Sequence, residues 1–364
     1  MALEGEIEVG LRLAAGRVAG VRIASTRPDV ARLMLEGRER AQAQKLVPLL
    51  FSICGRSQGV AAELACAAAA GEPIDAAALR RLPHAVGAEI VREYAWRMLL
   101  DWPQALGEPA SPAAVAAARG SLAWQGDDAD GSAAIAEAVY GMSATAWLAL
   151  ETPAAIQSWI AAGATVPARH LRRLCRDDEP GAAAQATVPL LPATDPALWV
   201  PALARVDDPD AARRPTRDGA AAETGALARR QQDPLIAAWL AAHPSRVPAR
   251  ALARLRELAL LLAGRGDVAL GACAVGPGAG LSWVENARGL LLHRVTLERS
   301  AEGDRVAQWR IVAPTDWNFH PEGALAVALR GQIAADPDQI KSHTQVLVHA
   351  LDPCVSCRIG FDDA

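Results

Sequence analysis

The 364-residue chain is 51% apolar and 21% charged, which is typical of a globular protein that buries a large core as one domain or two. Its formal net charge of −4 argues against a general binder of nucleic acid or of a membrane surface. The sequence opens without a basic, apolar leader, and none of its apolar runs approaches the ~20 residues of a spanning helix. We therefore expect a cytoplasmic protein whose six cysteines are reduced thiols.

The first seventy residues predict a β-hairpin followed by helices. From residue 6 to 13 apolar side chains alternate with polar ones or glycine, and Ala15-Gly16 supplies a turn before the chain returns. Apolar periodicity then predicts helices over 29–36 and 38–50. Ser57 is expected to cap the next helix, which ends near residue 70.

The middle of the chain is predicted to be almost entirely helical up to about residue 176. The clearest helical segments are 89–99, 133–150 and 154–161. Residues 177–232 are rich in Pro, Asp, Gly, Ala and Arg, and this composition predicts a long irregular or mobile loop.

The last third is predicted to combine helices with strands. Helical patterns resume after the loop, and an extended stretch with a hairpin signal at Ala301–Asp304 precedes two more helices. The predicted helices cover 235–242, 249–262, 321–330 and 337–350, and the predicted strands lie within 268–312. Asp336 and Pro337 have the residue types of an N-cap and a first helical position, so the final helix leads directly to Asp352.

Two cysteine motifs lie at opposite ends of the chain. Cys354 and Cys357 form a Cys-x-x-Cys pair in Asp352-Pro353-Cys354, and Cys54-Gly55 lies about 300 residues upstream. Two thiolates alone are too few ligands for a tetrahedral metal, so the pair needs partners. The alternatives are a surface thiol pair, half of a zinc site completed by nearby histidines, or a fold that brings both motifs together around a thiophilic group.

Five segments in order resemble the large subunit of nickel–iron hydrogenases. The matches to that family are an N-terminal strand, the first half of an Arg-x-Cys-Gly-x-Cys motif, a Glu-Ala-Pro-Arg-Gly stretch, a Pro-Thr-x-Trp-Asn stretch and a C-terminal Asp-Pro-Cys-x-x-Cys. In this chain they are Leu3–Val9, Ile53–Gly55, Glu285–Gly289, Pro314–Asn318 and Asp352–Cys357. The resemblance implies one domain over residues 1–364, mainly α with small antiparallel β-sheets (α+β).

The departures from the hydrogenase pattern concern the metal ligands. Ser57 replaces the second cysteine of the first motif, Ser52 replaces its arginine, and Gly360 replaces a C-terminal histidine. A hydroxyl is a poor ligand for a soft metal because it is not deprotonated near neutral pH. The C-terminal extension that hydrogenases lose on maturation is also missing. We therefore expect that the chain does not hold a complete nickel–iron centre.

These departures make the chain similar to the HupK/HoxV-type hydrogenase accessory proteins. That resemblance implies a non-catalytic scaffold that assembles or carries an Fe(CN)2(CO) unit and passes it to an apo large subunit, together with a small maturation chaperone. It implies that Cys54, Cys354 and Cys357 bind iron, and that Arg288 and Thr315 donate hydrogen bonds to the cyanides. Nickel is not expected.

Other interpretations of the same residues remain open. The chain could be a metal-free mimic of the large subunit that binds maturation partners or, less favoured because of the missing sulfur, a nickel-binding hydrogenase. Arg288 could form an ordinary salt bridge and Thr315 could cap a turn. Glu4 matches a proton-relay position of hydrogenases and is expected to be structural. Cys66 is expected to face the core.

Overall fold

A computed structural model of the chain describes residues 5–51, 53–126, 128–176, 187–203, 209–243, 245–301 and 303–362. The chain forms two compact units. Unit 1 comprises Met1–Arg80, Gln185–Ala228 and Ala269–Ala364, and unit 2 comprises Arg81–Ala184 and Arg229–Val268. The prediction of one domain over residues 1–364 stays a prediction.

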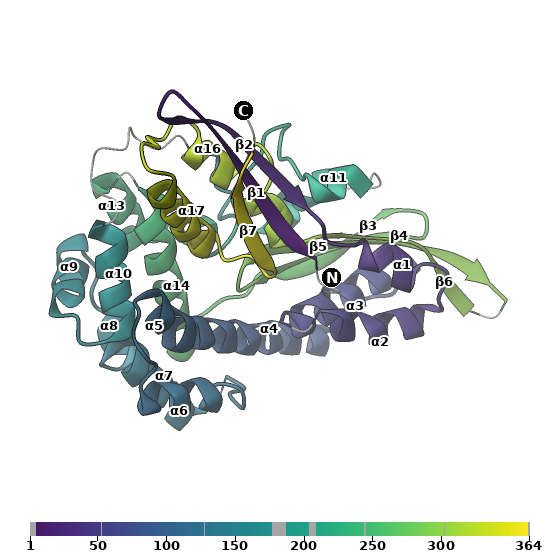
Figure 1. Ribbon diagram of the computed structural model, residues 1–364. Helices are drawn as coiled ribbons and strands as arrows, with labels where there is room; N and C mark the ends of the chain where they lie inside the picture. Colours follow the sequence, from purple (N-terminus) through teal and green to yellow (C-terminus); the bar gives the residue numbers. More distant parts are fainter. Residues whose placement is uncertain are drawn as a thin grey trace. The chain divides into compact units, whose positions relative to one another are not determined.

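The first and last strands of unit 1 lie side by side in a three-stranded sheet of order β2-β1-β7 (Figure 1). The predicted hairpin is confirmed as β1 (Glu6–Ala14) and β2 (Arg17–Ser25), which pair antiparallel. The sequence analysis missed β7 (Ser356–Phe361), which pairs with β1 in parallel. A Cβ at Gly10 would lie 2.2 Å from a carboxylate oxygen of Asp362, so glycine there leaves room for the Asp362 side chain.

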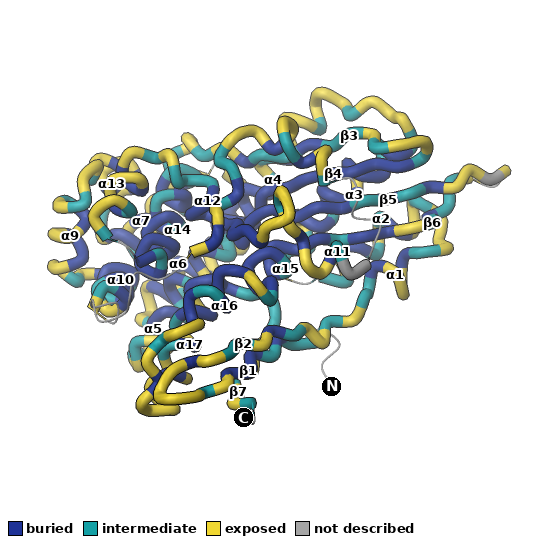
Figure 2. Tube along the Cα trace, turned by 90° about the horizontal axis from the view of Figure 1, so that it is seen from above, coloured by how far each residue is buried: buried dark blue, intermediate teal, exposed yellow. Residues whose placement is uncertain are grey.

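The second sheet of unit 1 has four antiparallel strands in chain order. They are β3 (Leu270–Gly276), β4 (Ala279–Asn286), β5 (Gly289–Ser300) and β6 (Gly303–Val312). Every residue of β4 is buried (Figure 2). The helix α3 (Gly55–Ala70) packs on the sheet so closely that a Cβ at Gly280 would lie 2.2 Å from the Ala65 carbonyl oxygen.

Helices α1 (Val30–Leu35) and α2 (Arg40–Leu50) precede α3, as the sequence predicts. The prediction that Ser57 caps α3 is wrong, because the helix begins two residues earlier with Cys54 as its N-cap. A Cβ at residue 55 would lie 2.7 Å from the Pro48 carbonyl oxygen. Gly55 therefore lets the chain turn sharply after α2, and Ser57 is buried in the first helical turn.

The remainder of unit 1 contains short helices and the C-terminal helix. In the described parts of residues 177–232, predicted as an irregular loop, there are 3-10 turns and two short helices, while 177–186 and 204–208 lie outside the described residues. Asp336 caps the last helix through its carboxylate, which accepts from the Asp338 amide at 2.9 Å, as predicted. These elements are Pro196–Leu198, Val200–Leu203, α11 (Pro209–Arg213), α12 (Ala226–Arg230, which extends into unit 2), α15 (Pro314–Asn318), α16 (Ala324–Leu329) and α17 (Pro337–Leu351).

Unit 2 is helical, as predicted. The predicted helix over 133–150 is wrong in one respect, because it is divided at Gly141, a left-handed C-cap, and Ser143, the N-cap of the next helix. The helices are α4 (Ala76–Trp96, which begins in unit 1), a π-helical turn at Arg97–Asp101, α5 (Trp102–Ala105), α6 (Pro112–Gly120), α7 (Ala129–Tyr140), α8 (Ala144–Leu148), α9 (Pro153–Ala162), α10 (Val166–Arg176), α13 (Pro234–Ala242) and α14 (Arg246–Leu262).

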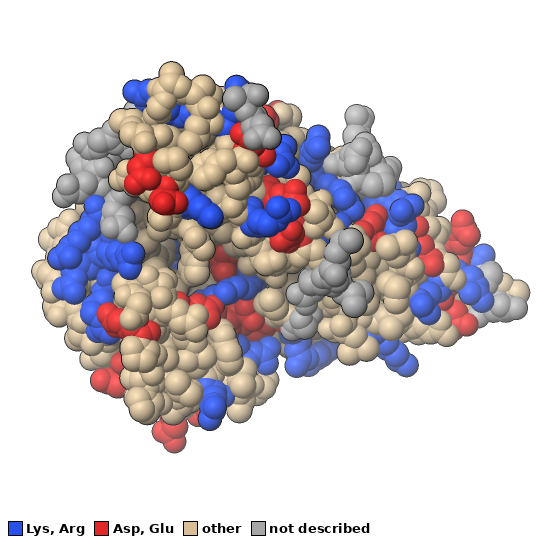
Figure 3. Space-filling view, viewed as in Figure 1, with Lys and Arg blue, Asp and Glu red and all other residues tan. Residues whose placement is uncertain are grey.

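The predicted fold class, mainly α with small antiparallel β-sheets, is confirmed, except that β1 and β7 pair in parallel. Among the described residues, no helix combines the length and the apolar character needed to cross a membrane. On the face seen in Figure 3, basic and acidic side chains are interspersed among uncharged residues. This mixture agrees with the small net charge of the sequence.

Candidate ligand site

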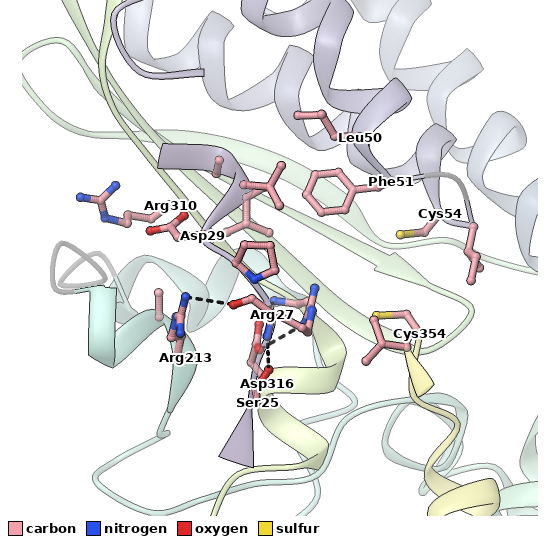
Figure 4. Close-up of a pocket in the computed structure, with 18 of the residues that line it drawn as sticks. Ser25, Arg27, Asp29, Leu50, Phe51, Cys54, Arg213, Arg310, Asp316 and Cys354 are labelled. Carbon is pink, nitrogen blue, oxygen red and sulfur yellow. Dashed lines mark hydrogen bonds and ion pairs between the residues drawn. The ribbon is translucent and has the colours of Figure 1, made fainter. Parts of the chain in front are cut away.

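A cavity of about 380 Å³ in unit 1 brings together segments that are distant in the sequence (Figure 4). Its walls come from the loop between β2 and α1, the segment between α2 and α3, the end of β6, the start of α15 and the turn before β7. Cys54 and Cys354, from the two cysteine motifs, both line it. The cavity is within the size range of small-molecule sites in proteins.

Cys54 is the N-cap residue of α3 and is linked to a buried histidine. The side-chain amide of Gln58, one turn further along, donates to the Cys54 sulfur at 3.7 Å. The amide oxygen of Gln58 lies 2.8 Å from His293 Nε2 on β5. Burial lowers the pKa of His293 to about 3, so the ring is neutral at physiological pH. Nε2 must then carry the proton, because an amide oxygen only accepts, and the amide nitrogen is turned toward Cys54.

Cys354 lies in the turn between α17 and β7 and contacts Thr315 of α15. The Thr315 hydroxyl is 3.2 Å from the Cys354 sulfur, and the Cys354 amide donates to the same hydroxyl oxygen at 3.5 Å. With its oxygen accepting from the amide, the hydroxyl is free to donate to sulfur. The structure therefore places Thr315 against one predicted ligand, whereas its predicted contact with a cyanide stays a prediction.

A basic residue that the sequence analysis did not select, Arg27, lines the same cavity. Its Nη1 atom is 3.4 Å from Asp316 Oδ1, and the other Asp316 oxygen accepts from the Ala313 amide at 2.7 Å. Burial acts to lower the pKa of Arg27, but negative charge at Asp316, Cys354 and Cys54 raises it above its usual value. Burial raises the pKa of Asp316, against the opposing effect of Arg27. Arg27 is thus a cation that interacts electrostatically with both cavity thiols when they are ionised.

Cys357, the third predicted ligand, lies on β7 opposite Ile7 of β1 and is not among the residues that line the cavity. Burial, with a contribution from Glu6, raises the pKa of its thiol to about 11. Within the described parts of the chain, no group of three or more His, Cys, Asp or Glu side chains is arranged to hold a metal ion. The three-thiolate ligand set stays a prediction.

Arg288 links two of the motifs rather than lining the cavity. It is buried in the turn between β4 and β5, and its Nε atom lies 3.8 Å from Asp352 Oδ2, just before Cys354. Asn286 fixes the turn by accepting from the Arg288 amide at 2.9 Å. Gly289, with φ +134°, is required there because a Cβ would lie 2.5 Å from Thr224. The predicted contact of Arg288 with a cyanide stays a prediction. Glu4, the match to a proton-relay position, lies outside the described residues.

The sequence analysis missed Arg27, Asp316, Gln58 and His293. Gln58 could have been found, because position i+4 after Cys54 lies on the same face of a helix that begins there. Arg27 and His293 carry no local signal, since only the tertiary fold brings a loop and a strand to α3. Cys66 lies on the buried face of α3, as expected, and burial raises the pKa of its thiol to about 12.

Comparison with solved structures defines the class of this fold. The chain superposes on a chain of the nickel–iron–selenium hydrogenase of D. vulgaris Hildenborough in its reduced state. The TM-score is 0.60 at 16% identity, and the match covers 94% of each chain. Residues 273–360 match the sequence profile of the nickel-dependent hydrogenase family. The protein therefore has the fold of a nickel–iron hydrogenase large subunit, as predicted.

Relatives that match over almost the full length of the chain define its family within this fold class. The chain is 33% identical to the hydrogenase expression/formation protein HoxV of Cupriavidus necator, over 96% of this chain and 94% of that protein. It is 29% identical to the hydrogenase expression/formation protein HupK of Bradyrhizobium diazoefficiens, over 100% of this chain and 99% of that protein. The chain belongs to the HupK/HoxV family of hydrogenase expression/formation proteins, as the sequence motifs predict.

Proposed function

We propose that this protein is a non-catalytic scaffold that holds an Fe(CN)2(CO) unit during hydrogenase maturation and passes it to an apo large subunit. The observation that carries the proposal is the position of Cys54 and Cys354 on one cavity, each with a hydrogen-bond donor at its sulfur. Low-spin iron with diatomic ligands is soft enough to favour thiolates. Donors to sulfur stabilise the thiolate form that binds a metal.

The chemistry of the cavity residues fits a cargo that is released again. Two thiolates from the chain bind less firmly than a full set of four, and Ser57, at the position of a bridging cysteine in hydrogenases, offers only a hydroxyl. Transfer then exchanges two iron–sulfur bonds of the scaffold for two formed by thiolates of the acceptor. The iron keeps its oxidation state, so the step needs neither an oxidant nor a reductant.

The partners follow from this proposal. The acceptor is the apo large subunit, and a small maturation chaperone delivers or accompanies the iron unit. The alternative is a metal-free mimic that binds the same partners through its hydrogenase-like surface, which the match over 94% of a hydrogenase chain favours. Both proposals describe a protein without hydrogen turnover of its own.

The experiment that separates them uses protein purified without oxygen from cells that contain the complete maturation machinery. Infrared spectra of the wild type should show cyanide and carbonyl stretches with about one iron per chain. A Cys54→Ser and Cys354→Ser double variant should lose both the bands and hydrogenase maturation. Maturation that survives in the double variant, or a wild type without the bands, would favour the metal-free mimic.

A matched control comes from a cysteine outside the cavity. Cys66 of α3 faces the apolar core, and burial keeps its thiol protonated. A Cys66→Ala variant should therefore keep the iron content and infrared bands of the wild type. Equal loss of iron in this variant and in the double variant would mean that the cavity thiols have no special role.

A further inference from the structure

Arg27 is the cavity residue whose charge the proposed scaffold does not yet use. It lies in the loop between β2 and α1, and 19% of its side chain is exposed. Asp316 binds it through one oxygen only, because the second oxygen accepts from the Ala313 amide. A guanidinium has five N–H donors in a planar fork, so this single contact leaves it able to serve a second acceptor.

Four charged side chains besides Arg27 line the same cavity, namely Asp29, Arg213, Arg310 and Asp316. Arg213, like Arg27, acts to lower the pKa of Asp316, against the larger effect of burial. Arg213 itself donates to the Arg27 carbonyl oxygen at 3.2 Å, which holds the loop against α11. Arg310, a third cavity arginine, is already paired with Glu36. Asp29 lines the cavity as well, and its carboxylate accepts from the Arg32 amide at 3.1 Å and lies 3.7 Å from Arg32 Nε.

The proposed cargo is an anion whose ligands accept hydrogen bonds. Iron(II) with two cyanides, one carbonyl and two thiolates carries two net negative charges. A cyanide nitrogen bound to iron is a hydrogen-bond acceptor, and a guanidinium keeps its charge when partly buried. Figure 4 shows the sulfur atoms of Cys54 and Cys354 on one side of the cavity with Arg27 beside them.

We propose that Arg27, positioned by Asp316, donates N–H hydrogen bonds to a cyanide ligand of the iron unit held by Cys54 and Cys354. This inference rests on the proposed function and adds a binding residue to it. Arg288, the arginine that the sequence motif favours for this role, is buried against Asp352 and does not line the cavity. The arginine that binds the cyanide would thus be Arg27 of the loop after β2, and not Arg288, to which the motif resemblance assigns this role.

The test compares Arg27→Met with Arg22→Met in protein purified with the maturation machinery. Arg22 is a matched control: it lies on β2 and forms a bidentate pair with Asp362 at 2.9 and 2.8 Å, outside the cavity. Loss of one charge-assisted hydrogen bond should lower the retained iron about tenfold to a hundredfold in Arg27→Met. The Arg22→Met variant should match the wild type. Wild-type iron content and unshifted cyanide bands in Arg27→Met would overturn the inference and leave the proposed function intact.

Two further variants guard against misfolding. Arg27→Met leaves Asp316 buried without its cation, so an Arg27→Met and Asp316→Asn double variant removes both charges together. Arg27→Lys keeps the charge but loses the planar fork, and it should retain iron with cyanide bands shifted from the wild type. A double variant that folds like the wild type by circular dichroism and retains its full iron content would overturn the inference.

A second arm applies if the wild type shows no cyanide bands, which would defeat the proposed function. Titration calorimetry then uses hexacyanoferrate(II), an iron complex whose cyanide nitrogens face outward, as the probe. An affinity at least tenfold weaker in Arg27→Met than in Arg22→Met would support Arg27 as the residue that binds cyanide ligands. Equal affinities in the wild type and both variants would overturn it.

Discussion

Replacing His293 with phenylalanine should change how the stability of unit 1 depends on pH. Burial lowers the pKa of His293 to about 3 from its usual 6.5, so the unfolded chain binds a proton between these values and the folded chain does not. Stability should therefore be complete above pH 6.5 and fall as the pH decreases toward 3. At pH 4.5, two units below the unfolded pKa, the loss should be about 3 kcal/mol.

Phenylalanine removes this titration but also the hydrogen bond to Gln58. The ring at position 293 lies edge-on to Trp309 at 5.8 Å, an arrangement that phenylalanine can keep. The Gln58 amide oxygen would be left buried without the His293 donor, at a cost of about 1–3 kcal/mol. The variant should therefore be less stable than the wild type at pH 8. The two stabilities should become equal between about pH 4.5 and 6, where the proton penalty of the wild type matches this cost.

Hydrogen–deuterium exchange of peptides from β5 measures the pH dependence of stability within unit 1. A local measurement is needed because a chain with two compact units need not unfold in one step. The opening free energy, corrected for intrinsic exchange rates, would be compared between pH 4.5 and 8. Parallel curves for His293→Phe and the wild type over the whole range would refute the assignment of His293 as a buried neutral ring.

Three further predictions concern single side chains. Under the two-thiolate proposal, Cys357→Ser should retain most of the iron that Cys54→Ser loses, because Cys357 does not line the cavity. Equal loss of iron in the two purified variants would instead support the predicted three-thiolate ligand set. Glu257→Gln should destabilise unit 2 by about 3–5 kcal/mol in urea unfolding, because it leaves the buried Arg229 cation next to a neutral group. The control, Glu322→Gln, removes an exposed ion pair and should change the stability by less than about 1 kcal/mol. Gly289→Ala should lower the melting temperature, measured by differential scanning calorimetry, because its Cβ would lie 2.5 Å from Thr224.

The pH dependence of the Glu257 effect has a definite sign. The Arg229 and Arg230 cations overcome burial and lower the pKa of Glu257 to about 2 from 4.5. This contribution to stability is present above pH 4.5 and is lost as the pH falls toward 2. The difference between Glu257→Gln and the wild type should therefore shrink below pH 4.5.

The local sequence determined the helices of unit 2 and the N-terminal hairpin. These features depend on apolar periodicity and on residues such as glycine and proline, which act over a few positions. The cysteine motifs, in their order along the chain, also identified the hydrogenase-like family. The same local rules misplaced the cap of α3, because the turn at Gly55 depends on its contact with Pro48.

The tertiary structure alone decided which motif residues meet. The strand β7 forms because β1 offers it a free edge, and its six residues carry little apolar pattern of their own. Arg27 reaches the cavity because the loop after the hairpin packs near α15, where Asp316 binds the guanidinium. Such contacts join residues hundreds of positions apart, and their free energy comes from burial and paired charge, which no local pattern records.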